Sequence, residues 1–114
     1  MWALSRKDSI LTKEAYWAYE FQCEQSLEAI LDILIETSPW DWHSRDSYWY
    51  GDYLNSRPMK GVRVRIHEWP ESRYTILLQI DSESTAERSA IDEGIKVIFE
   101  KLEAKNVRET EPYD

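Results

Sequence analysis

Residues 62–80, VRVRIHEWPESRYTILLQI, carry the clearest secondary-structure pattern in the chain. On both sides of Trp69-Pro70-Glu71-Ser72, apolar residues occupy alternate positions, which is the period of a half-buried β-strand. We therefore expect two antiparallel strands that form a hairpin with its turn at residues 69–72. The side chains expected to face the core are Val62, Val64, Ile66, Tyr74, Ile76, Leu78 and Ile80.

The intervening positions of this hairpin predict the composition of the other face of the sheet. That face carries Arg63, Arg65, His67, Thr75, Leu77 and Gln79. Guanidinium and imidazole groups can recognise a carboxylate or a phosphate, so Arg63, Arg65 and His67 are candidate ligand-binding residues. The alternative is an ordinary solvated strand face, on which His67 is a surface histidine beside Glu68.

Two further elements are expected upstream of the hairpin. Residues 16–23 alternate as a strand, with core positions at Trp17, Tyr19, Phe21 and Cys23. Ser26 stands where a helix N-cap is favoured, and Pro39 ends the helix because a proline disfavours helical backbone before it. The apolar stripe of this helix is Leu27, Ile30, Leu31, Leu34 and Ile35.

A second helix is expected downstream. Ser84 and Glu87 have the spacing of a capping box, so the helix is predicted to begin there. Gly94 lies on the apolar side, where a missing side chain would allow close packing on the sheet. The stripe comprises Ile91, Ile95, Ile98, Phe99 and Leu102. The tail from Asn106 onward is expected to be frayed.

Between the first helix and the hairpin, residues 40–58 are dense in aromatic and polar side chains. We expect one strand there, over Ser47 to Leu54, with a bulge or a close backbone approach at Gly51. The predicted fold is thus a single α+β domain over residues 1–114, of order β-α-β-β-β-α. In it an antiparallel sheet of about four strands carries two helices packed on one face.

Composition limits the setting and the partners. Cys23 is the sole cysteine, and no apolar leader or membrane-spanning run is present, so we expect a cytoplasmic protein with no membrane association. The formal net charge of −8 disfavours non-specific nucleic-acid binding, and we expect no nucleic-acid partner. The same acidity can steer a basic partner, or can simply maintain solubility.

The segment from residue 40 to residue 53 concentrates the residue types that dominate protein interfaces. Trp and Tyr combine large contact area with a polar group, and neighbouring carboxylates can attract a basic partner. The candidate partner-binding residues are Trp40, Asp41, Trp42, Asp46, Tyr48, Trp49, Tyr50 and Asp52. The alternative is that alternate aromatics fill the core.

Motifs for catalysis, metals and cofactors do not emerge. His43 and His67 lack metal-ligand spacing, and three scattered glycines build no phosphate-binding loop, so we expect no metal and no cofactor. No residue pattern that would activate the Cys23 thiol as a nucleophile is present, so we expect Cys23 to be a small core residue. Acid–base catalysis by Asp46 or Asp52 with His43 stays open, but the pattern favours a protein that is not an enzyme.

In size, acidity and aromatic content the chain is similar to small acidic bacterial immunity and inhibitor proteins, which neutralise a toxin by occluding a basic site. This likeness implies a non-enzymatic protein-binding domain with a basic partner. The alternative function is a small-ligand-binding or catalytic domain that recognises an anionic group through its Arg- and His-lined face. A third interpretation is a homodimer formed through that face or through an unpaired edge strand.

Overall fold

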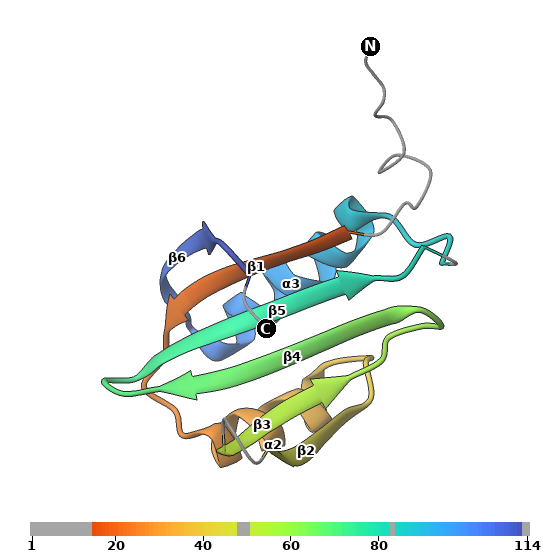
Figure 1. Ribbon diagram of the computed structural model, residues 1–114. Helices are drawn as coiled ribbons and strands as arrows, with labels where there is room; N and C mark the ends of the chain where they lie inside the picture. Colours follow the sequence, from red (N-terminus) through yellow and green to blue (C-terminus); the bar gives the residue numbers. More distant parts are fainter. Residues whose placement is uncertain (1–14, 48–50, 83, 113–114) are drawn as a thin grey trace.

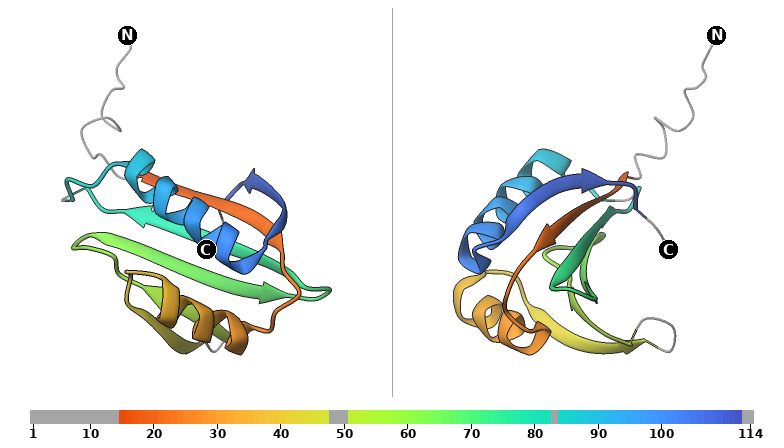
Figure 2. Two further views of the ribbon diagram at one scale, coloured as in Figure 1. Left: turned by 180° about the vertical axis from the view of Figure 1, so that it is seen from behind. Right: turned by 90° about the vertical axis from the view of Figure 1, so that its left-hand side faces the viewer.

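A computed structural model describes residues 15–47, 51–82 and 84–112. All strand pairs are antiparallel and belong to one sheet of order β2-β3-β4-β5-β1-β6. Both helices lie on the same face of this curved sheet (Figures 1 and 2), which confirms the α+β class. The elements are β1 (Ala15–Gln22), α2 (Leu27–Thr37), β2 (Trp42–Ser47), β3 (Gly51–Ser56), β4 (Val62–Trp69), β5 (Arg73–Ile80), α3 (Arg88–Leu102) and β6 (Lys105–Thr110).

The hairpin predicted at residues 62–80 is confirmed. β4 and β5 pair from Val62 with Ile80 to Trp69 with Arg73. In the connecting turn, Glu71 has a φ of 68° and Ser72 a φ of 61°. Two successive left-handed residues reverse the chain within a short loop and preserve the twist of the flanking strands.

The single strand predicted over Ser47 to Leu54 is wrong, because this region forms two paired strands. β2 and β3 pair from Trp42 with Ser56 to Ser47 with Gly51. β2 lies at the edge of the sheet and is mostly polar, so apolar alternation did not mark it. Gly51 has a φ of 74°, and nothing lies within 4 Å of a Cβ built there, so its backbone conformation requires glycine rather than a close contact.

The tail from Asn106 was expected to fray, but this expectation is wrong. β6 pairs with β1, with Glu109 opposite Tyr19 and Arg108 opposite Glu20. Almost every residue of β6 is exposed, so the strand has no apolar alternation that a sequence pattern can detect. Together with the β2–β3 hairpin it gives six strands rather than four, in the chain order β-α-β-β-β-β-α-β.

Helix α2 follows its sequence signals closely. The Ser26 Oγ accepts a hydrogen bond of 3.1 Å from the Ala29 amide, as an N-cap should. The helix ends at Thr37, just before Pro39. Ile30 and Leu34 are fully buried, but Ile35 is 59% exposed, so its place in the apolar stripe was wrong.

Helix α3 begins later than its capping-box pattern predicts. The Ser84 Oγ accepts a hydrogen bond of 3.0 Å from the Ala86 amide, so it stabilises a turn before the helix. The helix starts at Arg88, and Glu87 makes no side-chain cap. The expected stripe is confirmed, since Ile91, Ile95, Ile98 and Leu102 are buried and Phe99 packs against them.

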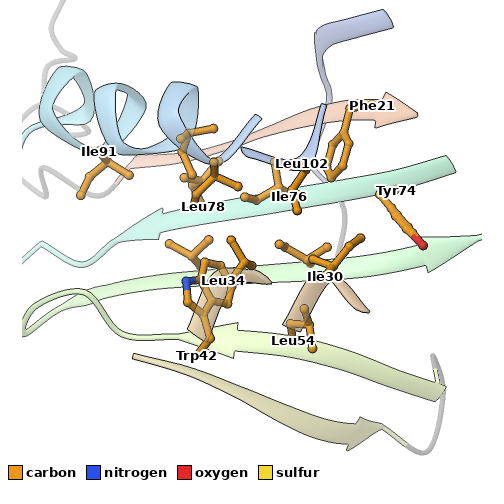
Figure 3. Packing of buried hydrophobic residues seen from close by; sticks show 14 of the residues in the cluster. Phe21, Ile30, Leu34, Trp42, Leu54, Tyr74, Ile76, Leu78, Ile91 and Leu102 are labelled. Carbon is orange, nitrogen blue, oxygen red and sulfur yellow. The ribbon is translucent and has the colours of Figure 1, made fainter. Parts of the chain in front are cut away.

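The core lies between the sheet and the two helices (Figure 3). Ile30 and Leu34 of α2 and Ile91 of α3 face the apolar strand residues, and Trp42 enters the same cluster. A Cβ built at Gly94 would lie 2.5 Å from Cζ2 of Trp40. Gly94 therefore makes room for an indole that follows α2, and its close contact is with this ring rather than with the sheet.

Candidate functional site

The face of the sheet opposite the helices is the candidate site, and we call it the outer face. Strand register fixes its membership, because residues directly opposite each other share a face. Arg65 lies opposite Asn55 and Leu77, and His67 lies opposite Tyr53 and Thr75. The outer face comprises Tyr16, Ala18, Glu20, Gln22, His43, Arg45, Tyr53, Asn55, Arg63, Arg65, His67, Trp69, Arg73, Thr75, Leu77, Gln79, Lys105, Arg108 and Thr110.

The charge on the outer face is opposite in sign to that of the whole chain. The strand positions that define this face hold five arginines, one lysine (Lys105, opposite Gln22) and one carboxylate, that of Glu20, which gives a formal charge of +5. The chain as a whole carries −8. The fold therefore gathers cationic groups on one face of an acidic protein. These arginines are Arg45, Arg63, Arg65, Arg73 and Arg108.

The carboxylate of Glu20 pairs with two of the five guanidinium groups. Arg108 Nε donates to its carboxylate at 2.8 Å, and Arg73 Nη1 lies 3.3 Å from it. The hydrogen bond from Arg108, with help from Arg73, lowers the pKa of Glu20 below its ordinary value. The carboxylate stays charged at neutral pH and is shared between the two arginines.

Three arginines have no carboxylate partner among the described residues, namely Arg45, Arg63 and Arg65. Arg65 Nη2 donates a hydrogen bond of 3.2 Å to the Tyr16 hydroxyl, which holds the guanidinium over β1. The Arg63 Nε is buried without a hydrogen-bond partner in the described part of the chain. These groups are the donors that an added anion would satisfy most readily.

His67 is not the surface histidine that its position in the sequence suggested. Its side chain is 4% exposed, and its ring stacks on Tyr53 with centroids 5.0 Å apart. Burial, and then the positive charge of Arg65, lower the pKa of His67 to about 4. The ring is therefore neutral at neutral pH and adds hydrogen-bonding groups rather than charge.

Aromatic and amide side chains alternate with the arginines on the outer face. Tyr16, Tyr53 and Trp69 are half-buried, and Trp69 Nε1 donates a hydrogen bond of 3.0 Å to the Thr75 hydroxyl. Asn55, next to Arg65 in register, is 7% exposed, and its Oδ1 accepts no hydrogen bond from the described residues. The face thus combines cations, ring surfaces and a hydrogen-bond acceptor.

No protein-family model matches the chain, and no curated protein has a matching sequence.

The alternation in β4 pointed to Arg63, Arg65 and His67, and the register places all three on one face, as expected. Arg45, Arg73 and Arg108 were missed, because Arg45 and Arg108 lie in edge strands without apolar alternation and Arg73 stands where β5 leaves the turn. The positions of Arg45 and Arg108 depend on pairing between distant segments, which local patterns do not reveal.

The aromatic segment is divided between the core and the surface. Trp42 is 3% exposed and its Nε1 donates to the Ser38 Oγ at 3.1 Å, so its ring is not available to a partner in this structure. Trp40 is half-buried beside Gly94. Tyr48, Trp49 and Tyr50 lie outside the described residues. Of the described aromatic side chains predicted to bind a partner, Trp42 therefore belongs to the core and Trp40 is only partly accessible.

The carboxylates of this segment are exposed. Asp46 and Asp52 lie directly opposite each other in the β2–β3 hairpin, and Asp41 Oδ2 lies 3.0 Å from Nε2 of His43. Like charges at directly opposite positions destabilise a sheet. A cation placed against Asp46 and Asp52 would remove that repulsion.

The described residues give little support to a metal site or to a nucleophilic cysteine. Within residues 15–47, 51–82 and 84–112, no three His, Cys, Asp or Glu side chains gather as a metal site would require. No helix in the same ranges is long and apolar enough to cross a membrane. Cys23 is buried and its Sγ donates to the Leu102 carbonyl at 3.4 Å, and burial raises the pKa of its thiol. That shift disfavours the thiolate, so Cys23 is a core residue rather than a nucleophile.

Proposed function

We propose that this protein is a non-enzymatic binding domain whose outer face recognises an anionic ligand. The observation that carries the proposal is the concentration of five arginines and one lysine, with one glutamate, on one face of a chain with a net charge of −8. Arg63 and Arg65 are neighbours on the same face of β4, about 7 Å apart along the strand, so their like charges repel each other in the free protein. An anionic ligand would offset that repulsion.

The choice of residue supports an anion with planar oxygen groups. Five of the six strand cations of the outer face are arginines, and the forked guanidinium matches a carboxylate or phosphate in two parallel hydrogen bonds. Arg63 and Arg65 are half-buried, so their hydrogen bonds to an anion would be less screened than those of fully exposed side chains. His67 is neutral and buried, which suits it to orienting a ligand rather than to proton transfer at neutral pH.

Retention on immobilised heparin at neutral pH and low ionic strength tests the proposal, because a protein of uniform negative charge would flow through. We expect the wild type to be retained and R63Q/R65Q to elute at clearly lower salt. K96Q/K101Q removes the same charge from the exposed surface of α3 and serves as the matched control. Flow-through of the folded wild type, or equal losses in the two double variants, would count against an anion site on the outer face.

A second candidate, binding to a basic protein partner, is favoured by the opposed carboxylates Asp46 and Asp52. Such a partner would relieve their repulsion, and a basic partner is also what the resemblance in bulk character to small acidic immunity proteins implies. Affinity capture with wild type and D46N/D52N, followed by mass spectrometry, tests this. A basic protein held by the wild type and lost by the variant would support it, and equal capture by both would exclude the carboxylate pair.

A further inference from the structure

The outer face is broader than a small anion requires. Its arginines stand on β2, β4, β5 and β6, and five inter-strand steps separate the two edges of the sheet. At about 4.8 Å a step, this distribution extends over about 24 Å. Guanidinium groups so dispersed do not converge on a single phosphate or carboxylate. They match a chain of anionic groups.

Aromatic rings interrupt the arginines on the same face. Tyr53 lies in register between Arg45 and His67, and Trp69 lies opposite Arg73. Tyr16 accepts a hydrogen bond from Arg65. Rings on an open sheet face are the stacking surfaces that proteins use for unpaired bases, and arginine planes can add to the stack.

The outer face offers a hydrogen-bond acceptor as well as the donors of its arginines. Asn55 is 7% exposed, and its Oδ1 has no donor among the described residues. Phosphates and ionised carboxylates only accept hydrogen bonds, so they cannot satisfy this oxygen. Nucleic-acid bases carry N–H donors beside their anionic backbone, and they supply both kinds of group at once.

We infer that the anionic ligand is a single-stranded nucleic acid, with its phosphates against the arginines and its bases stacked among the tyrosine and tryptophan rings. This inference rests on the proposed function. The overall charge of −8 opposes non-specific binding at long range, but screening confines electrostatics to about 8 Å at physiological ionic strength. Within that range the ligand meets the arginines of the outer face. An acidic polypeptide would offer carboxylates but no regular series of planar rings.

Fluorescence anisotropy with the intact protein and three labelled probes of equal length tests the inference. The probes are an oligothymidylate, the corresponding abasic sugar–phosphate strand and poly-L-glutamate. We expect the oligothymidylate to bind at least about 10-fold more tightly than the abasic strand, because each stacked base adds a factor of about 5 to 150. This comparison needs no mutant, so it does not depend on whether a variant folds.

Two variants locate the interaction. Y53L removes the ring but keeps an apolar side chain, and we expect it to weaken oligothymidylate binding by about 5-fold or more while Y53F binds like the wild type. R65Q should weaken every phosphate-bearing probe and lower the salt dependence by a slope of about 0.7. Far-UV circular dichroism and thermal unfolding establish that each variant is folded before its affinity is compared.

The outcomes separate this inference from the proposed function. Equal binding of all three probes, with loss in R65Q, would show an anion-binding face without base stacking and would overturn the nucleic-acid inference alone. Preference for poly-L-glutamate would identify an acidic polypeptide as the ligand and would also overturn it. No binding of any probe to the folded wild type would overturn both.

Discussion

Acidification should destabilise the protein through His67. In the folded protein the pKa of His67 is about 4, and its ordinary value is 6.5. The unfolded chain therefore takes up this proton at a higher pH than the folded chain, so stability falls as the pH drops from about 6.5 to about 4. A difference of about 2.5 pKa units at 1.36 kcal/mol each makes the loss about 3 kcal/mol. Below about pH 4 this contribution is lost completely.

Urea unfolding at a series of pH values, for the wild type and H67Q, measures this loss. The variant is expected to be less stable at neutral pH, since His67 is buried and packed on Tyr53. Its free energy of unfolding should vary less between pH 6.5 and pH 4, and the difference between the two curves isolates His67 from the carboxylates. Because the charge of Arg65 also lowers the pKa of His67, R65Q should raise it.

Nuclear magnetic resonance provides a direct check on the same prediction. The His67 ring resonances, assigned by their loss in H67Q, should titrate near pH 4 in the wild type. Titration near pH 6.5, or parallel pH profiles of stability for wild type and H67Q, would refute the burial of a neutral imidazole beside Arg65.

Three further predictions concern stability and are checked by denaturant or thermal unfolding. G94A should destabilise the protein despite the gain of about 1 kcal/mol in helix propensity, since its Cβ would overlap the Trp40 indole, and in a W40A background the same change should stabilise. An equal effect in both backgrounds would contradict that contact. S26A should lower the free energy of unfolding by about 1 kcal/mol, because it removes the N-cap of α2, and S26D should retain most of that stability. L77A should cost about 2 to 4 kcal/mol and I35A less than about 1, because Leu77 is 2% exposed and Ile35 59%; the reverse order would contradict the assigned burial.

Much of the central fold was predictable, because its elements bury an apolar face with a regular period. β4 and β5 alternate around a strong turn signal, and α2 has a serine cap and a proline beyond its end. β2 and β6 were not predictable, since edge strands that are mostly polar leave no such period. Ile35 and Leu77 show the remaining ambiguity. An apolar residue at a plausible position can be exposed on a helix or buried on the outer face of the sheet.

The candidate site was predictable only in part. Alternation along β4 assigned Arg63 and Arg65 to one face, but Arg108 lies on that face only because β6 pairs with β1, which places it opposite Glu20, 88 positions earlier in the chain. The net charge of the chain was a poor guide to the charge of the candidate site. A sum over the chain does not reveal that folding places cations on one face and most carboxylates elsewhere.

An anionic ligand bound to the outer face should perturb the arginines of β4 and the strands beside them. Titration of the isotope-labelled protein with a heparin-derived oligosaccharide, followed by two-dimensional amide and arginine side-chain spectra, locates the bound ligand residue by residue. We predict that shifts concentrate on Arg63, Arg65 and their neighbours in β1 and β5, while the amides of α2 and α3 are unchanged. Shifts confined to the helices or to the β2–β3 hairpin, or no shifts in the folded protein, would contradict it.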